Sequence, residues 1–352
     1  MKILHESTLW QLLDRVVGTV RTVRLFEALA IHQDLLRPLT GKVSRAELAQ
    51  ALNMLLFEDV TRRVPMAAAY VGDAVRHGQK LVFDHGALRT VAADCGALPA
   101  GHLAFARILE PLGFEVRDTY PLEKLAMTGR AYAHRDLPEH IAQFFVSELH
   151  PECFTDTFQR AVLRTVGGSR DPLPLSAKGL LVELSERREL GFDDAAHLLP
   201  NLFGCFDRQH AEPSWADYQA LLRESKEMAW IATEGNSFNH ATDRVADVVA
   251  VAERQRRLGR PMKDTVEVSK SGRVRQTAFR AATVERLFVG DDGALVAAQV
   301  PGSFHEFISR DEERPGVLDL RFDAGNATAI FKMTANDGAR RDADPEIEKA
   351  SV

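Results

Sequence analysis

One order of secondary-structure elements occurs twice in this sequence, and it restricts the fold more than any other feature. The first copy reads as a strand, a helix and three strands, at 81–83, 101–113, 115–120, 124–134 and 141–149. The second copy reads as a strand, a helix, a hairpin and a closing strand, at 230–240, 242–258, 265–281 and 300–310. The sequence therefore predicts an α+β fold with two βαβββ modules.

Helical segments precede and separate the two modules. Apolar residues recur at three- and four-residue steps before residue 80, as in Leu48, Ala51, Leu52 and Leu55. The end of the chain is rich in charge and poor in apolar residues, which is typical of disorder. We predict an N-terminal helical region, a first module, a helical insertion, a second module with a C-terminal segment, and a disordered tail, at 1–80, 81–152, 153–226, 227–334 and 335–352.

The composition argues against nucleic-acid and membrane partners. The chain is 45% hydrophobic and 27% charged, and its formal net charge of -6 comes from interspersed charges with no basic stripe. No apolar run approaches the ~20 residues that a bilayer span needs, and the first residues do not resemble a signal peptide. Cys95, Cys153 and Cys205 are irregularly spaced, which favours a reducing compartment. We expect a cytoplasmic protein.

Two histidines and one glutamate lie in strand-like runs that are remote from one another in the chain. They are His85 and His240, each in the first strand of a module, and Glu306 in the closing strand of the second. Glu306 lies between Phe304 and Phe307, and an ionised carboxylate is costly to bury without a partner. Two imidazoles and a carboxylate that leave other positions open form the ligand set of non-haem Fe(II) oxygenases.

Other side chains are expected to contact a small molecule. Residues two apart on a strand share a face, so His85 and Arg89 should point the same way from roots ~13 Å apart. The planar guanidinium of Arg89 suits a carboxylate, which predicts a short anionic acid held between it and the metal. Ser269 and Gln276 are polar residues in partly apolar hairpin strands and are weaker candidates for orienting that acid.

The same alternation assigns faces to the strands of the second module. On the run 230–240 one face would carry Glu234, Asn236, Phe238 and His240. On the closing strand one face would carry Phe304, Glu306, Ile308 and Arg310. Phe238 and Phe304 would then keep the pocket dry. Glu148 lies in the closing strand of the first module as Glu306 does in the second, so it is a further candidate for a place near the metal.

Five blocks of sequence resemble the motifs of a known family. The blocks DHGALR, FFVSEL, NSFNHAT, SGRVRQTA and GSFHEF begin at residues 84, 144, 236, 271 and 302. They look like those of the 2-oxoadipate dioxygenase/decarboxylase family, also called hydroxyglutarate synthase, and the resemblance spans about residues 80 to 332. It implies a vicinal-oxygen-chelate (glyoxalase-like) core whose curved sheet surrounds the metal.

The resemblance also implies a site and a reaction. Fe(II) would be held by His85, His240 and Glu306, with Mn2+, Co2+, Zn2+ or Ni2+ as substitutes, and Arg89 would bind the substrate. The substrate would be a 2-oxo acid and O2 the co-substrate. With 2-oxoadipate the products would be 2-hydroxyglutarate and CO2, a step in lysine breakdown. The family's C-terminal substrate-contacting segment has no clear match, and we expect Phe331, in the segment 326–331, to take its place.

Two rival hypotheses keep the fold and change the function. A glyoxalase-like isomerase or lyase would use Zn2+, Ni2+ or Mn2+ without O2, with Glu148 as a fourth ligand. A non-catalytic binding module would hold a small molecule in the cleft between the modules and bind no metal. Fold alone does not choose among these functions.

Overall fold

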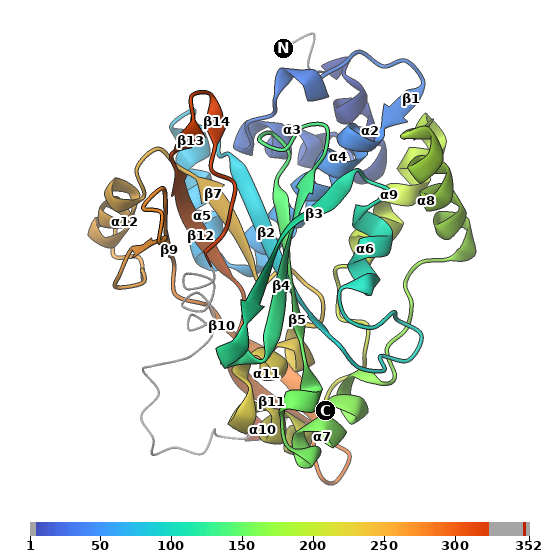
Figure 1. Cartoon of the computed structure of the whole chain (residues 1–352), viewed down its shortest axis with the longest axis vertical. Helices are drawn as coiled ribbons and strands as arrows, with labels where there is room; N and C mark the ends of the chain where they lie inside the picture. Colours follow the sequence, from blue (N-terminus) through green and yellow to red (C-terminus); the bar gives the residue numbers. More distant parts are fainter. Residues whose placement is uncertain (1–4, 324–347, 350–352) are drawn as a thin grey trace.

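The computed structural model describes residues 5–323 and 348–349 and contains an eight-stranded mixed sheet (Figure 1). The first module supplies the strands β2 Phe83–Val91, β3 Phe114–Leu122, β4 Met127–His134 and β5 Gln143–Leu149. The second supplies β7 His240–Arg244, β8 Glu267–Val268, β9 Val274–Ala278 and β12 Phe304–Arg310. The strand order is β3-β4-β5-β2-β7-β12-β9-β8. This order confirms the predicted α+β fold with two βαβββ modules.

The two modules are related by an approximate two-fold rotation, which the strand register shows. Within each module the first and last strands are parallel neighbours, β2 with β5 and β7 with β12. Between modules β2 and β7 pair antiparallel, with Gly86 opposite Ala241, His85 opposite Thr242 and Ala87 opposite His240. The rotation axis therefore passes through the Gly86–Ala241 pair, and the first strands of the two modules lie side by side at the centre of the sheet.

The strand predicted over 230–240 is wrong. Residues Lys226–Glu234 form helix α11, which begins after the capping side chain of Ser225 and ends at Gly235, where φ is +63°. Every residue of this helix from Glu227 to Glu234 is buried, so the segment lacks the polar face that identifies a helix in sequence. Strand β7 begins only at His240, and the helix predicted over 242–258 is α12, Val248–Arg257.

A second hairpin, absent from the prediction, precedes the closing strand. Strands β10 Thr283–Val289 and β11 Leu295–Pro301 pair with each other in a separate sheet. The predicted closing strand over 300–310 is therefore divided, and β12 begins at Phe304. Glu348–Lys349 form the short strand β15 beside β11, while the rest of the predicted tail and Phe331 lie outside the described residues.

Helices cover the face of the sheet that Leu88, Phe144 and Phe238 occupy, in one apolar core with the helices before β2. Those helices are α2 Thr8–Val17, α3 Thr19–Ala28, α4 Arg45–Arg63 and α5 Pro65–Arg76. The first module contributes α6 Leu103–Leu109 to this core, and the segment between the modules contributes α8 Leu175–Arg187 and α9 Phe192–Gly204. Helices α7 Asp156–Val166 and α10 Trp215–Glu224 pack in a second core, with α11 and the β10–β11 hairpin. The short strands β1 Lys42–Ser44 and β6 Glu189–Gly191 pair, which joins the N-terminal region to that segment.

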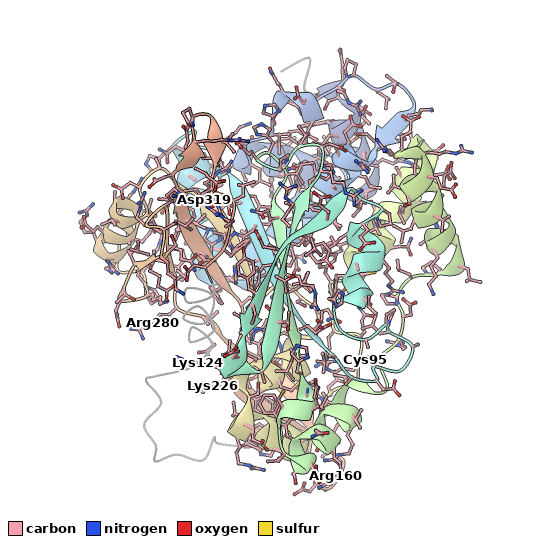
Figure 2. All side chains as sticks on the ribbon, in the orientation of Figure 1. Cys95, Lys124, Arg160, Lys226, Arg280 and Asp319 are labelled. Carbon is pink, nitrogen blue, oxygen red and sulfur yellow. The ribbon has the colours of Figure 1, made fainter. Side chains whose placement is uncertain are left out.

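Side chains fill the space between these layers, as Figure 2 shows. Asp319 lies close to the hairpin of β13 Glu312–Arg314 and β14 Val317–Leu318, which follows β12. Among the helices that the structure describes, none combines the length and apolar character that a membrane crossing requires.

Candidate metal centre

Three neighbouring strands bring His85, His240 and Glu306 together. His85 lies on β2, His240 begins β7, and Glu306 lies on β12, with β7 between the other two strands. One ligand atom from each residue lies within 4.8 Å of the others. The exposed fractions are 2%, 5% and 0%, so water does not solvate these groups. The structure thus gathers the three residues expected to bind a metal.

The donor atoms of this cluster suit a divalent cation. Glu306 Oε2 lies 3.1 Å from His240 Nε2 and 3.5 Å from His85 Nε2, and it accepts a hydrogen bond from Thr242 Oγ1 at 2.9 Å. Glu306 Oε1 and both ring nitrogens of His240 have no hydrogen-bond partner in the described part of the chain. Buried polar atoms normally have partners, and a cation among them would supply one. Two imidazoles and a carboxylate are ligands that iron and its neighbours in the first transition row accept.

The charges of the cluster depend on one another. Burial raises the pKa of Glu306, but the imidazoles of His240 and His85 outweigh burial, and the pKa lies below its ordinary value. Burial lowers the pKa of His240, and the opposing carboxylate of Glu306 does not restore it. For His85, burial also lowers the pKa, but hydrogen bonds to Asp84 and Glu306 raise it above the ordinary value overall. The carboxylate therefore stays ionised, which a metal ligand requires.

A small cavity adjoins His85 and His240, and side chains from both modules line it. Its volume is about 30 Å3, and its walls include Arg89, Phe145, Asn239, Gln276 and Phe322. A space of this size holds a water molecule. A six-carbon diacid is larger, so its binding requires some of these side chains to move.

Arg89 enters this cavity from β2, on the face that the sequence predicted. Its side chain is buried, and its guanidinium lies over the ring of Trp230 at 4.9 Å from the centroid. Burial lowers the pKa of Arg89 to about 10, against the opposing charge of Glu227, so the group remains a cation at neutral pH. The same cavity is therefore lined by candidate metal ligands and by a buried cation.

The two hairpin residues proposed as substrate contacts have different positions. Gln276 lines the cavity, as expected. Ser269 does not, because its hydroxyl accepts a hydrogen bond from the Val274 amide at 3.1 Å and lies 3.0 Å from the Ser271 hydroxyl. Ser269 therefore stabilises the turn between β8 and β9.

Asn239 is a cavity residue that sequence reasoning missed. It lines the wall beside His240, and within the described chain its Oδ1 has no hydrogen-bond partner. Strict alternation along a strand over 230–240 would turn Asn239 away from His240. Since β7 begins at His240, that rule does not apply to Asn239, and its position directly before a candidate ligand was the available signal.

Three expectations about side chains near the site are wrong, namely those for Glu234, Phe238 and Glu148. Glu234 is in helix α11 and pairs with Arg286 at 2.6 Å, away from the cavity. Phe238 lies on the opposite face of the sheet, where its ring packs against Gly86. Phe304 is on the predicted side and stacks on the His240 ring with centroids 4.8 Å apart.

Glu148 is the third of these, and it does not join the cluster. Its neighbour Ser147 lines the cavity, so alternation along β5 turns Glu148 to the other face. There it accepts hydrogen bonds from the His102 amide at 2.7 Å and from Arg130 at 3.0 Å. The carboxylate holds the start of α6 and is not a fourth ligand in this structure.

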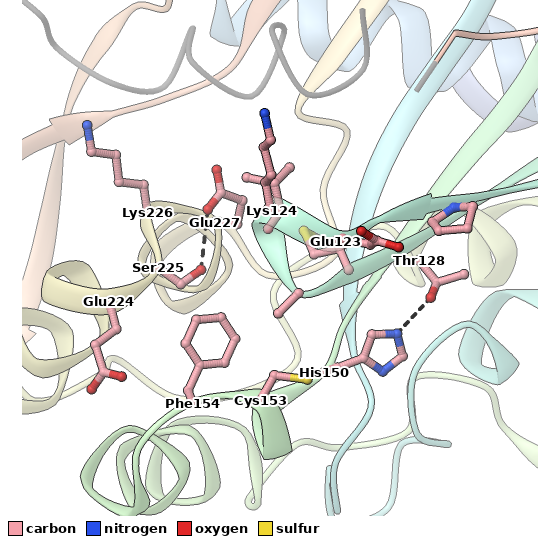
Figure 3. A pocket seen from close by; sticks show the side chains of 14 residues that line it. Glu123, Lys124, Thr128, His150, Cys153, Phe154, Glu224, Ser225, Lys226 and Glu227 are labelled. Atoms are coloured by element: carbon pink, nitrogen blue, oxygen red, sulfur yellow. Dashed lines mark hydrogen bonds between the residues drawn. The ribbon is translucent and has the colours of Figure 1, made fainter. Parts of the chain in front are cut away.

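A larger, open pocket lies where the beginning of α11 and the turn between β3 and β4 meet (Figure 3). Its volume is about 920 Å3, and Lys124, His150, Cys153 and Lys226 line it. None of the three candidate metal ligands lines this pocket. The small cavity, not the larger one, therefore has the chemistry expected of a metal site.

Comparison with known proteins gives the same picture. Residues 48–318 match the family model described as 2-oxoadipate dioxygenase/decarboxylase. The chain is 24% identical over 298 residues to the rice protein "2-oxoadipate dioxygenase/decarboxylase, chloroplastic/amyloplastic", a match that covers 75% of this chain and 72% of that protein.

Solved structures share the fold. A putative glyoxalase superfamily protein from Ralstonia eutropha JMP134 is 55% identical, with a TM-score of 0.87 over 90% of this chain and 99% of that one. Rice hydroxyglutarate synthase, solved in complex with 2-oxoadipate, is 20% identical, with a TM-score of 0.64 over 88% of this chain and 96% of that one. The family match extends over most of the chain, through both modules and all three candidate ligands. This chain belongs to the 2-oxoadipate dioxygenase/decarboxylase family.

Proposed function

We propose that the protein is a non-haem Fe(II)-dependent dioxygenase and decarboxylase of a 2-oxo dicarboxylic acid. The proposed reaction converts 2-oxoadipate and O2 to 2-hydroxyglutarate and CO2, in lysine degradation in the cytoplasm. The observation that carries the proposal is the meeting of His85, His240 and Glu306 beside a buried Arg89. Family membership and the rice neighbour that binds 2-oxoadipate support the choice of substrate.

In this proposal each cavity residue has a separate role. His85, His240 and Glu306 hold the iron, which supplies electrons and a template for the reaction with O2. Arg89 pairs with a carboxylate of the substrate and fixes its direction relative to the metal, since a planar guanidinium binds carboxylates in two-point geometry. Gln276 and Asn239 offer amide groups to the remaining oxygens. The rings of Phe145, Phe304 and Phe322 limit the access of water.

The test uses iron-loaded protein prepared without oxygen. A panel of 2-oxo diacids is added with O2, and oxygen uptake and CO2 release are followed together. We expect uptake and release in equal amounts with 2-oxoadipate. Absence of both with every acid on the panel, in protein that holds iron, would refute the dioxygenase proposal. Turnover of a substrate without oxygen would instead favour the isomerase or lyase.

Metal retention provides an independent check on the ligands. His240→Ala should lose bound iron, while His150→Ala, which alters a half-buried histidine of the large open pocket, should retain it. Elemental analysis of the purified variants measures both. Equal iron content in the two variants would exclude His240 as a ligand. A wild-type protein that binds no metal would favour a non-catalytic binding module.

A further inference from the structure

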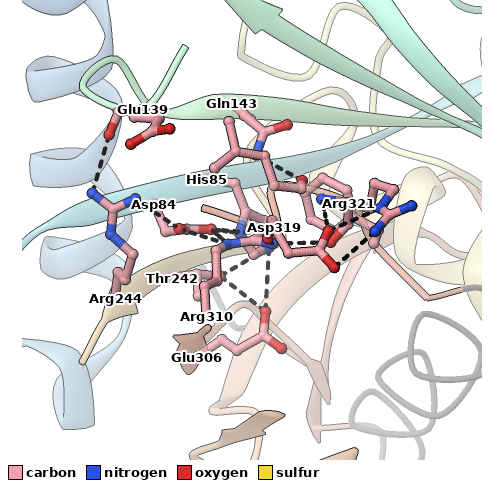
Figure 4. Close-up of polar contacts among 12 residues, drawn as sticks. Asp84, His85, Glu139, Gln143, Thr242, Arg244, Glu306, Arg310, Asp319 and Arg321 are labelled. Atoms are coloured by element: carbon pink, nitrogen blue, oxygen red, sulfur yellow. Dashed lines mark hydrogen bonds and ion pairs between the residues drawn. The ribbon is translucent and has the colours of Figure 1, made fainter. Parts of the chain in front are cut away.

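Arg310, the last residue of β12, holds two parts of the site at once. Its side chain is fully buried, and its Nε and Nη2 donate to the Asp84 carboxylate at 3.0 and 2.9 Å. Its Nη1 donates to the backbone carbonyls of Asp319 at 2.8 Å and Arg321 at 2.9 Å. Figure 4 shows Arg310 between Asp84 and the backbone that continues past Asp319. All three nitrogens of one guanidinium are therefore engaged.

The Asp84 contact reaches the metal cluster through His85. The pairing of β2 with β7 shifts register between Phe83 and His85, which leaves Asp84 at an irregularity of the strand. Such bulges redirect side chains, and here Asp84 Oδ1 lies 2.8 Å from His85 Nδ1. A hydrogen bond at Nδ1 fixes the tautomer of a histidine and presents the lone pair of Nε2, the atom on the side of Glu306.

The other contact of Arg310 reaches the wall of the cavity. Residues 319–322, which we call the pocket strap, follow the β13–β14 hairpin and end at Phe322. The Phe322 ring lies edge-on to the His85 ring, with centroids 4.8 Å apart. Further hydrogen bonds hold the strap, among them those from Gln143 Nε2 to the Leu320 carbonyl at 3.2 Å and from the Phe322 amide to the Tyr120 hydroxyl at 3.0 Å.

We propose that Arg310 is a positioning residue that fixes the metal-binding orientation of His85 and the closed position of the pocket strap together. The proposal rests on the proposed function, in which His85 is a metal ligand. One side of the guanidinium holds Asp84 and hence His85, and the other holds the strap whose Phe322 covers His85. A change at Arg310 therefore alters metal affinity and strap order in one step.

The variant Arg310→Lys separates this role from that of a simple buried charge. Arg310→Lys keeps the positive charge but cannot donate to Asp84 and to two carbonyls in the planar geometry of a guanidinium. Outer contacts of this kind change metal affinity by about 10- to 100-fold when removed. We expect the Co2+ dissociation constant of metal-free protein to rise by about that factor, and the amides of 319–322 to exchange with deuterium faster.

Two further variants each weaken one of the two connections, the contact with His85 or a hydrogen bond to the pocket strap. Asp84→Asn weakens the contact with His85 and should lower Co2+ affinity, with a smaller effect on strap exchange. Gln143→Leu removes a bond to the strap and should accelerate its exchange, with a smaller effect on Co2+ affinity. Arg244→Lys is the matched control, because Arg244 also lies near Asp84, at 3.9 Å, but donates to the Glu139 carbonyl instead of the strap. It should leave both measurements near wild type.

The outcomes distinguish failure of this inference from failure of the proposed function. Wild-type Co2+ affinity and wild-type strap exchange in Arg310→Lys would overturn the inference. If that variant does not fold, the contrasting effects of Asp84→Asn and Gln143→Leu carry the test, and identical effects of the two would overturn it. If wild-type protein binds no Co2+, the proposed function fails, and with it the metal half of the inference.

Discussion

The packing of Phe238 on Gly86 allows a stringent test of the centre of the sheet. A Cβ atom at Gly86 would lie 2.1 Å from Cε2 of the Phe238 ring, 2.5 Å from Cζ and 2.7 Å from Cδ2. The ring is 1% exposed, and the rings of Phe144 and Phe206 each lie with centroids 5.6 Å from it. The ring cannot retreat without displacing these neighbours, so Gly86→Ala should strain the pairing of β2 with β7.

The size of the effect follows from two opposing terms. Overpacking of a well-filled core costs about 1–3 kcal/mol, and separations near 2 Å place this site in the upper part of that range. Replacing glycine by alanine in extended backbone returns about 0.4–1 kcal/mol, because the unfolded chain loses freedom. We therefore expect Gly86→Ala to lower the free energy of unfolding by about 2 kcal/mol.

Urea unfolding of metal-free protein, in the presence of a chelator, measures this change. Phe238→Leu in the Gly86→Ala background should recover part of it, with a coupling energy of about 1 kcal/mol or more between the two sites. Gly72→Ala is the matched control, because it lies in helix α5 and its new Cβ would meet only Arg76 Nη1 at 3.5 Å. It should gain about 0.5–1 kcal/mol. Equal stabilities of Gly86→Ala and wild type would show that the ring does not pack as described.

Two further predictions concern pH and substrate. Burial raises the pKa of Asp243 to about 7, although the Tyr70 hydroxyl donates to it. Between the pKa values of Asp243 in the unfolded and folded states, the folded protein binds more protons than the unfolded chain. The Asp243 carboxyl therefore lowers the free energy of unfolding as pH rises from 5 to 8, by roughly 2–3 kcal/mol. Asp243→Asn should remove that part of the pH dependence in urea unfolding of metal-free protein, and an unchanged profile would contradict it. Gln276→Leu should raise KM for 2-oxoadipate about tenfold in oxygen-uptake assays, whereas Ser269→Ala should change KM less than about twofold, because Gln276 lines the cavity and Ser269 does not. Equal effects of the two variants would contradict the assignment of Gln276 as a substrate contact.

Local patterns in the sequence were enough to predict most of the sheet. Strands β3, β4 and β5, the hairpin over 265–281, and the apolar run around Glu306 all show alternation or turn residues that act over a few positions. Helix α11 was missed for the opposite reason. It is buried along almost its whole length, so it has no polar stripe, and its Trp230, Ile231 and Thr233 suit a strand as well as a helix.

The site was predictable only as far as single residues are unusual in their surroundings. Glu306 is a carboxylate in an apolar run, His85 and His240 lie in strand-like runs, and the structure brings the three together. The pair of Asp84 and Arg310 could not be predicted, because 226 positions separate the partners and a bulge redirects Asp84. Contacts of this kind depend on the register between distant strands, which no local pattern encodes.

The two-fold relation between the modules explains why, among the described residues, the cluster contains three candidate ligands and the first module adds no carboxylate to it. The rotation carries His240 onto His85. The first and last strands pair in the same register in both modules, so the rotation also carries Glu306 onto Phe145. Phe145 lines the cavity, so the first module presents an aromatic ring where the second presents a carboxylate. Glu148, chosen by chain order alone, is three positions further along β5 and on the opposite face. Two imidazoles and one carboxylate on one side of a metal would leave its other positions for small molecules, which is what the proposed reaction of an acid with O2 requires.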